Sequence, residues 1–346
     1  MTTHTALSLR LASLAEARDL LARSGTDGLT YLCLRDGARA LTRGEAAMAF
    51  FRCGGGAIAV GAPSGPAYDA FPLLHDFLDL SRREDWRPAF CGLPGPYAEH
   101  VAGLGFRLAS VGDEAIVELS AIDLRGKRWR EARAAMNRAR RRGITFRWLS
   151  AGERFARLDE LTAVSRDWLA AKHLPELRFA FGNADSLADP AVCLGTAIGP
   201  DSELLGFVTW TPAPVRSEWM LDLLRNRPNV MAGLNDFLIT SSLLSFKAEG
   251  LDRASLSGTP FAGSPVGWGP LRARDLAKPF RSLYDYDGLL HFKAKFNPVW
   301  RKRYLAYEGR LGLPATLLHI ARLSMPSAIA MALIPPVVLA AWALGG

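Results

Sequence analysis

Cysteine is scarce in this chain, and the cysteines present form no recognisable pattern. The 346 residues include four of them, with no C-x-x-C pair and no histidine at a metal-ligand spacing. A disulfide framework or a zinc site is therefore not expected, and a reducing compartment fits better. A secretory signal is also missing, because residues 1–10 show no apolar run after a basic patch. The four cysteines are Cys33, Cys53, Cys91 and Cys193.

The common catalytic motifs are missing as well. The sequence has no G-x-S-x-G elbow, no H-E-x-x-H pair and no Walker loop. The six histidines stand apart from one another, and only His291, close to Lys293, lies in a suggestive context. Because a lone histidine is more often structural than catalytic, we prefer the structural interpretation of His291.

Acidic residues are almost absent from one segment that accounts for most of the net charge. The whole chain carries a formal net charge of +8. Residues 127–142 read KRWREARAAMNRARRR, with eight basic residues against the single acidic Glu131. A second stretch, 291–310, holds six lysines and arginines against Glu308 alone. Such clustering indicates a polyanionic partner, and a merely solvated charged helix is the alternative.

The first half alternates short apolar runs with helical patterns. We expect strands at 57–61, 88–92 and 115–119, and a helix at 71–83. The basic segment is expected to be a helix, because an apolar stripe recurs in it at helical spacing and Gly143 ends it. That stripe consists of Trp129, Ala132, Met136 and Ala139.

The second half has a clearer pattern. Strands are expected at 192–198 and 204–210 around a Gly-Pro-Asp-Ser turn, followed by a third strand at 219–224. A helix at 233–249 ends at Gly250, and a strand follows at 253–257. Three meandering strands, a helix and a further strand are the core order of the GNAT acyltransferase fold. We therefore expect an α/β (α+β) fold with two GNAT-like units side by side, at 1–150 and 151–310, and a hydrophobic tail at 311–346.

The end of the chain lacks charge altogether. Residues 325–346 read MPSAIAMALIPPVVLAAWALGG, about the length needed to cross a bilayer. Pro335-Pro336 would kink such a helix near its middle, which membrane helices tolerate. The basic residues just before it would place the globular body on the cytoplasmic side of the cell membrane. The alternative is a hydrophobic helix that packs on the body or lies in the membrane interface.

The junction after the third strand of the second half lacks the glycines of an acyl-CoA site. Such a site needs backbone N–H groups at a helix N-terminus, whereas residues 225–233 read RNRPNVMAG and are stiffened by Pro228. The junction does contain Asp222 and Arg225, three residues apart at the mouth of a strand. This pair suits a hydroxyl and a phosphate respectively, and a simple surface ion pair is the alternative.

Several segments resemble one family. The run GLLHFKAKFNPVW at 288–300, followed by YLAY at 304–307, is similar to the C-terminal signature of the aminoacyl-phosphatidylglycerol synthases. These are the lysyl- and alanyl-phosphatidylglycerol synthases of the multiple peptide resistance factor group. Residues 112–124, the basic helix, 168–182 and 221–238 resemble further blocks of that family, so the resemblance covers about residues 25 to 310.

The resemblance implies a tandem GNAT fold that moves an amino acid, lysine or alanine, from aminoacyl-tRNA to a hydroxyl of phosphatidylglycerol. Asp222 would orient or deprotonate that hydroxyl, while Arg225 and Lys293 would hold phosphate or the developing oxyanion. No metal or diffusible cofactor is implied. The residues expected to bind tRNA or anionic lipid are Lys127, Arg128, Arg130, Arg133, Arg138, Arg141 and Lys295.

The chain also departs from the larger family members. Those members begin with a bundle of membrane helices that flips the product lipid, and no such bundle precedes Met1. We therefore expect the C-terminal tail to serve as the membrane anchor and a separate protein to serve as flippase. Two other functions stay open: an acyl-CoA-dependent N-acyltransferase on the same fold, and a non-catalytic relative that binds tRNA or lipid.

Overall fold

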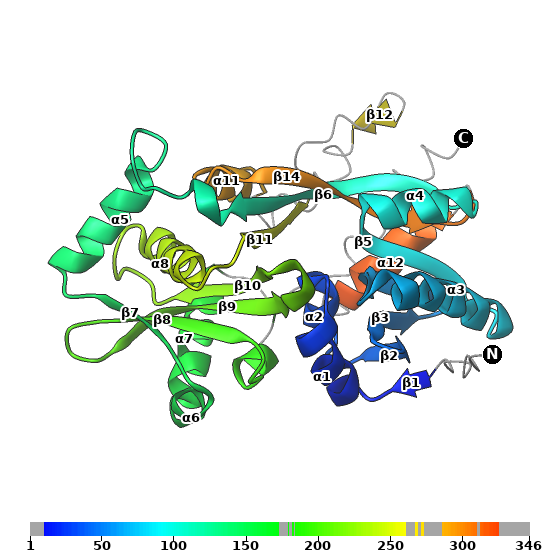
Figure 1. The fold of residues 1–346 in the computed structure, drawn as a ribbon, viewed down its shortest axis with the longest axis horizontal. Coiled ribbons are helices and arrows are strands. Elements are labelled where there is room, and N and C mark those ends of the chain that lie inside the picture. Colours follow the sequence, from blue (N-terminus) through cyan, green and yellow to red (C-terminus); the bar gives the residue numbers. More distant parts are fainter. Residues whose placement is uncertain are drawn as a thin grey trace, which may run out of the picture.

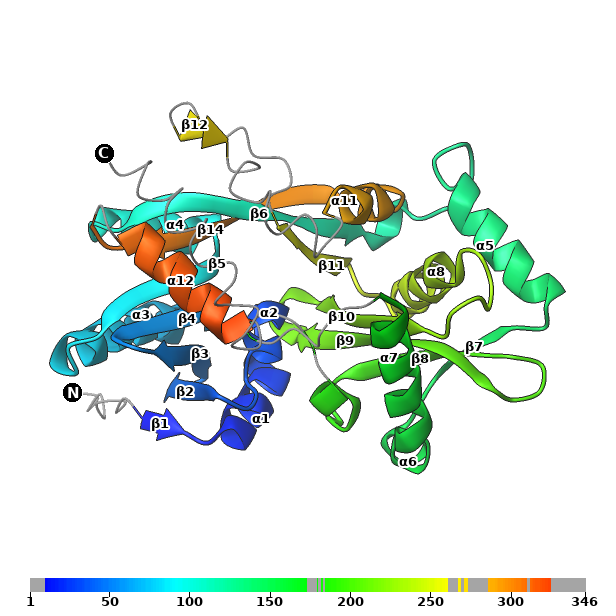
Figure 2. The ribbon, with the colours of Figure 1, turned by 180° about the vertical axis from the view of Figure 1, so that it is seen from behind.

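One sheet of twelve strands runs through the whole molecule, with helices on both of its faces (Figures 1 and 2). The computed structural model describes residues 10–172, 179, 182, 184–260, 267–268, 271–272, 286–309 and 312–324. Along the sheet the strands follow the order β1-β2-β3-β4-β5-β14-β6-β11-β10-β9-β8-β7, and β12 and β13 form a separate pair. The mixed α/β class expected from the sequence is confirmed.

The first half of the chain contributes one end of the sheet and the helices packed on it. Its elements are β1 (Arg10–Ala12), α1 (Leu14–Ser24), α2 (Gly28–Leu32), β2 (Ala38–Arg43), β3 (Ala46–Cys53), β4 (Gly56–Ser64), α3 (Ala67–Arg83), β5 (Arg87–Pro94), α4 (Gly95–Gly103) and β6 (Arg107–Glu118).

The second half begins with the basic helix. Its elements are η1 (Leu119–Ala121), α5 (Arg130–Arg141), β7 (Thr145–Trp148), α6 (Ala151–Ala156), α7 (Leu158–Lys172), η2 (Ala184–Leu187), β8 (Cys193–Ile198), β9 (Leu204–Ala213), η3 (Pro214–Arg216), β10 (Glu218–Asn226), α8 (Leu234–Ala248), β11 (Arg253–Pro260), β12 (Gly267–Trp268), β13 (Leu271–Arg272), α11 (Tyr286–Ala294), β14 (Val299–Tyr307) and α12 (Gly312–Ser324). The helices and strands predicted between residues 57 and 257 are present, most with ends moved by a few residues, and the strand predicted at 115–119 begins already at Arg107.

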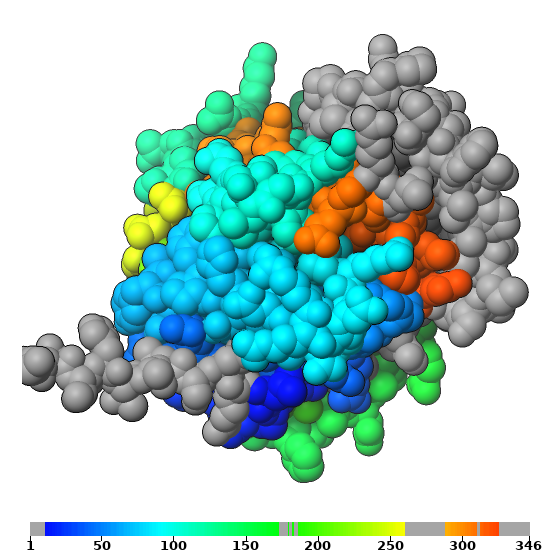
Figure 3. Space-filling model, turned by 90° about the vertical axis from the view of Figure 1, so that its right-hand side faces the viewer, coloured from blue at the N-terminus to red at the C-terminus, as the bar shows by residue number. Residues whose placement is uncertain are grey.

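The central strands are buried on both sides, which explains why their sequences are apolar runs. In β3, Met48 and Phe50 pack into the cluster beneath α3, while Ala49 and Phe51 pack into the cluster beneath α1. Successive side chains of a strand point to opposite faces, so one strand serves both clusters. Figure 3 looks at this end of the molecule and shows α3 and α4, in blue to cyan, covering its surface.

Two units with the same order of elements stand side by side in the sheet. β2, β3 and β4 form an antiparallel meander, α3 follows, and β5 pairs in parallel with β4. β8, β9 and β10 repeat this meander, α8 follows, and β11 pairs in parallel with β10. The units are interlocked, because β14 from the end of the chain lies between β5 and β6. The boundaries at 150 and 310 stay a prediction, since one continuous sheet joins the units.

The basic helix packs as its pattern predicts. Trp129, Ala132 and Ala139 of the apolar stripe are buried and Met136 is half-buried, against a core that includes residues of α8. The arginines occupy the other faces of α5. The backbone of Gly143 has a φ of +66°, the left-handed conformation that commonly follows a helix end.

The proposed membrane tail, residues 325–346, lies outside the described residues. The helix before it, α12, packs against β3, β4 and β14 and crosses the back of the first unit (Figure 2). Among the helices that the structure describes, none is both long and apolar enough to span a membrane. The spanning tail therefore stays a prediction.

Candidate active site

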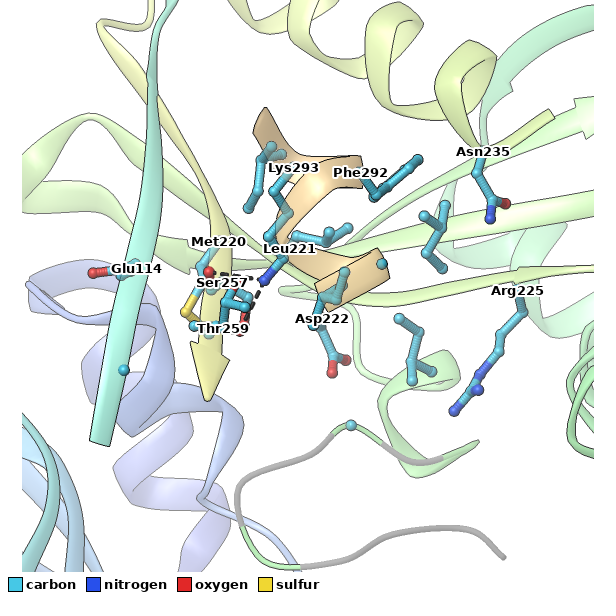
Figure 4. Close-up of a pocket in the computed structure, with 18 of the residues that line it drawn as sticks. Glu114, Met220, Leu221, Asp222, Arg225, Asn235, Ser257, Thr259, Phe292 and Lys293 are labelled. Atoms are coloured by element: carbon cyan, nitrogen blue, oxygen red, sulfur yellow. Dashed lines mark hydrogen bonds between the residues drawn. The ribbon is translucent and has the colours of Figure 1, made fainter. Parts of the chain in front are cut away.

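The parallel strands β10 and β11 separate partway along their length, and a cavity of about 990 Å³ opens there (Figure 4). Their pairing ends at Met220 and Ser255, although β10 continues to Asn226 and β11 to Pro260. Each strand has a register shift at this point, β10 against β9 and β11 against β6. Such bulges bend a strand and re-aim its side chains. The cavity therefore lies where the pairing of both strands is irregular.

Asp222 projects from β10 into this cavity (Figure 4). Its Oδ2 accepts a hydrogen bond of 3.2 Å from the Thr209 hydroxyl, and among the described residues its buried Oδ1 has no partner. Burial raises the pKa of Asp222 to about 6, although hydrogen bonding with Ser186, the charge of Arg35 and hydrogen bonding with Thr209 favour the ionised form. The carboxylate is therefore suited to accept a proton near neutral pH.

Gly182 approaches Asp222 closely. A Cβ atom at position 182 would lie 1.7 Å from Asp222 Oδ1, well inside van der Waals contact. The residue is buried and lines the cavity. The position therefore requires glycine if the carboxylate is to keep its orientation.

Arg225 lies near the end of β10, where its guanidinium stacks on an aromatic ring. Its Cζ is 3.9 Å from the centroid of Trp168, which α7 supplies. Cation–π stacking holds a guanidinium in a fixed plane. Arg225 is buried and Asp222 is half-buried, so neither has the exposed position that a surface ion pair requires.

Lys293 approaches the same cavity from α11 (Figure 4). Its Nζ donates to the backbone carbonyls of Ser257 at 3.0 Å and Gly258 at 2.8 Å, both on β11. Burial lowers the pKa of Lys293 to about 7, against the opposing effect of Glu114. Two of the three ammonium hydrogens are thus engaged, and the third remains for a substrate.

A buried ion network ties the units together at the wall of the cavity. Arg303 of β14 donates to Asp27 Oδ2 at 2.9 Å and to Glu114 Oε2 at 2.7 Å. Glu114 also accepts a hydrogen bond of 2.7 Å from the Ser255 hydroxyl. Burial alone would raise the pKa of Asp27, but the Arg303 guanidinium holds it below its usual value. Glu114 and Arg303 are therefore parts of the wall that hydrogen bonds hold in place.

The residues expected to bind tRNA divide into two groups. Lys127, Arg128, Arg130 and Arg141 are exposed on or just before α5. The others make internal contacts: Arg133 donates to the carbonyl of Leu124, Arg138 to that of Ala232, and Lys295 contacts Glu131 and Asp236. Arg138 and Lys295 therefore fix the basic helix against the loop and helix that follow β10.

The sequence analysis identified Asp222, Arg225 and Lys293, and the structure brings all three to one cavity. It missed the roles of Thr209, Gly182 and Trp168, because their partners are distant along the chain. His291 is exposed and is not among the described residues that line the cavity, and its structural interpretation stays a prediction.

Comparisons with known proteins agree with this geometry. The family model described as phosphatidylglycerol lysyltransferase, C-terminal, matches residues 18–307. The chain is 28% identical over 285 residues to a phosphatidylglycerol lysyltransferase of Bacillus subtilis, covering 81% of this chain and 33% of that protein. It is 26% identical over 257 residues to an uncharacterised protein of Corynebacterium glutamicum, covering 72% of this chain and 32% of that protein. The chain thus spans about a third of the length of these relatives.

Solved structures show the same fold. The structure of L-PGS from Bacillus licheniformis superposes with a TM-score of 0.78 at 26% identity, covering 89% of this chain and 96% of that one. The C-terminal domain of a putative lysylphosphatidylglycerol synthetase from Agrobacterium fabrum gives 0.74 at 25% identity, covering 88% and 94%. FemX superposes with a TM-score of 0.59 at 10% identity, covering 90% and 100%, a likeness of fold alone.

Proposed function

Because this chain belongs to the family of phosphatidylglycerol lysyltransferase C-terminal domains, we propose that it transfers an amino acid from aminoacyl-tRNA to a hydroxyl of phosphatidylglycerol or a related lipid. The observation that carries this proposal is the meeting of Asp222, Arg225 and Lys293 at one cavity between separated strands. The repeated order of elements supports the finer description of the fold as two GNAT-like units.

The reaction exchanges one activated ester for another. The lipid hydroxyl attacks the carbonyl carbon of the aminoacyl ester and passes its proton to Asp222. The bond between that carbon and the ribose oxygen of the tRNA then breaks, and the proton returns from Asp222 to the departing oxygen. Protons and electrons balance within the site, so the residues contribute by positioning and by stabilising charge.

Lys293 and Arg225 supply the positive charge in this scheme. The remaining N–H of the Lys293 ammonium stabilises the oxyanion of the tetrahedral intermediate, because the two carbonyl contacts fix its direction. Arg225, held flat on Trp168, binds the phosphate of the lipid headgroup. Asp222 must be ionised and Lys293 protonated, which their pKa values of about 6 and about 7 allow between those values.

The basic helix is the proposed tRNA contact. Its exposed residues Lys127, Arg128, Arg130 and Arg141 supply charge for phosphates, while Arg138 and Lys295 hold the helix in place. Anionic lipid is the second polyanion that this surface suits. Lysine and alanine are the candidate amino acids, and the tail at 325–346 is the proposed anchor at the cytoplasmic face of the membrane, with a separate protein as flippase.

A transfer assay tests the reaction. The protein is incubated with aminoacyl-tRNA carrying a radiolabelled amino acid, each amino acid in turn, and with vesicles of phosphatidylglycerol. We expect label in the organic phase, and none when the vesicles contain only phosphatidylcholine, which has no free glycerol hydroxyl. Failure with every aminoacyl-tRNA, in a preparation that acylates an amine from labelled acetyl-CoA, would favour the acyl-CoA alternative. Binding of tRNA or vesicles without any transfer would favour a non-catalytic role.

A further inference from the structure

Two polar side chains in the wall of the cavity have no part in the scheme above. Asp113 of β6 and Thr259 of β11 are direct partners across the antiparallel pair, so their side chains lie on the same face of the sheet. Both line the cavity. Asp113 is 9% exposed and Thr259 is 1% exposed, so both are withdrawn from bulk water.

Both side chains hold a buried atom without a hydrogen bond. Within the described part of the chain, Asp113 Oδ1 and Thr259 Oγ1 have no partner. A buried polar atom left unpaired costs free energy, and a carboxylate oxygen costs more than a neutral one. Such an atom on a cavity wall is most simply explained by a ligand that donates to it.

The charges around Asp113 point to a cation. Lys302 lies opposite Asp113 on β14, yet it is exposed, and the described residues include no ion pair between the two. Burial raises the pKa of Asp113, with Lys302 opposing. A neutral hydroxyl would leave the carboxylate charge uncompensated, and the lipid phosphate would be repelled by it. Of the groups that the proposed reaction brings, only an ammonium suits this wall.

We propose that Asp113 and Thr259 form the subsite for the primary ammonium of the aminoacyl group. This inference rests on the proposed function. It assigns the side of the cavity formed by β6 and β11 to the aminoacyl-tRNA, the donor of the reaction. Thr259 directly follows Gly258, whose carbonyl accepts from Lys293. In Figure 4 Thr259 lies beside the end of Lys293, across the cavity from Asp222. Because Asp113 is the strand partner of Thr259, an ester carbonyl held at Lys293 would direct its amino acid toward this wall.

The ammonium can be the α-ammonium of any amino acid or the side-chain ammonium of lysine, and the test separates the two. Transfer from lysyl-tRNA and alanyl-tRNA is measured with the wild-type protein, Asp113→Asn, Thr259→Val and Lys302→Gln. We expect Asp113→Asn to raise the KM for the donor about 10- to 100-fold, because a charged hydrogen bond is lost. Thr259→Val should raise it less, and Lys302→Gln should leave it within about twofold.

The pattern across the two donors identifies the group. A rise in KM with both donors assigns the subsite to the α-ammonium, and a rise with lysyl-tRNA alone assigns it to the side chain. An unchanged KM in Asp113→Asn would overturn the inference, as would equal effects of Asp113→Asn and Lys302→Gln, because Asp113 would then serve as a partner of Lys302. If the wild-type protein transfers nothing, the proposed function itself fails.

A binding measurement keeps the test independent of catalysis and of folding. The amides of L-lysine and L-alanine are titrated into each variant while the tryptophan fluorescence is followed, and circular dichroism checks the fold. We expect wild-type protein to bind these amides at least about tenfold more tightly than Asp113→Asn. Equal affinity in two folded proteins would contradict the subsite.

Discussion

The two units of the sheet share an order of elements but differ at one point. In the first unit the parallel strands β4 and β5 stay paired over five residue pairs, from Gly56 with Arg87 to Val60 with Cys91. In the second unit β10 and β11 pair over three, and both then shift register and separate. Beyond Val60 and Cys91 the strands β4 and β5 shift register too, against β3 and β14, so the first pairing also ends partway along its strands, two residue pairs later than the second.

The side chains of the two third strands match this difference. All residues of β4 (GAIAVGAPS) are buried, and Ser64 is its single polar side chain. β10 (EWMLDLLRN) places Asp222 and Arg225 where the strands part. The parallel strands β4 and β5 contribute only uncharged residues to the wall, Val60, Cys91 and Gly92. Pairing ends partway in both units, and the difference lies in the third strand: β10 carries charged side chains at the break, whereas β4 carries none.

Removing the charge of Asp222 from β10 should remove the feature that gives the second unit its proposed chemistry. We expect Asp222→Asn to lower kcat/KM for transfer by about 10²- to 10⁴-fold, because the proton acceptor is lost. The matched control is Asp201→Asn on the exposed turn between β8 and β9, which should keep full activity. Transfer at the wild-type rate by a folded Asp222→Asn protein would show that β10 is not the site of chemistry.

The same variant should be more stable than the wild-type protein. The folded-state pKa of Asp222 is about 6, against 3.8 for the unfolded chain, so its ionisation destabilises the fold as pH rises through that interval. We expect Asp222→Asn to gain about 3 kcal/mol above about pH 6, and the gain to become small near pH 4. Urea unfolding at both pH values measures it, and a gain that does not vary with pH would contradict the assigned pKa.

Breaking the network that joins the units should cost the most stability. Arg303→Met leaves Asp27 and Glu114 as buried carboxylates without their cation. We expect the free energy of unfolding to fall by about 3–5 kcal/mol. Arg82→Met, which removes the exposed pair with Asp79, should change it by less than about 1 kcal/mol. Similar effects of the two substitutions in urea unfolding would show that Arg303 is not the link between the units.

Displacing the Asp222 carboxylate without removing it should lower kcat/KM less than Asp222→Asn does. In Gly182→Ala the new methyl group would occupy the place of Asp222 Oδ1, so the side chain must rotate away. We expect kcat/KM to fall about 100-fold, while stability changes little. Gly152→Ala is the matched control, because a Cβ there meets no atom within 4 Å. Wild-type kinetics in Gly182→Ala would mean that the orientation of Asp222 is unimportant.

The pH range over which the site is active should be narrow. The value of kcat/KM should rise as Asp222 ionises near pH 6 and fall as Lys293 loses its proton above about pH 7. In Lys293→Arg the ammonium is replaced by a guanidinium that stays charged, so the alkaline fall should disappear even if the rate is lower. A rate that keeps rising above pH 8 in the wild-type protein would contradict the role of the Lys293 ammonium.

The smallest effect, a loss of tRNA affinity, is expected from replacing exposed arginines on or just before α5. Replacing Arg128, Arg130 and Arg141 by alanine should weaken tRNA binding and lower the slope of log K against log salt by about one per arginine. Replacing Arg82 and Arg83 on α3 of the first unit is the control, and should leave the slope unchanged. Filter binding at several salt concentrations measures both, and equal slopes would remove α5 from the tRNA contact.

Much of the fold was predictable because its signals are local. The apolar runs of β4 and β9, the turn between β8 and β9, and the apolar stripe of α5 depend on neighbours within a few residues. The insertion of β14 between β5 and β6 was not predictable in this way. The sequence of residues 299–307 does not indicate which strands they will pair with, because β5 and β6 lie far away in the chain.

The sequence by itself indicated the apolar strands, the basic helix and the pair Asp222 and Arg225 through residue types and short spacings, and its resemblance to a family added Lys293 and the proposed roles. Only the tertiary structure decided that β10 and β11 separate, that Gly182 and Thr209 meet Asp222, and that Asp113 and Thr259 are left unpaired. The physical reason is that burial and pairing depend on which distant segments share a surface. The pKa values near neutrality, on which the proposed chemistry depends, arise from that burial.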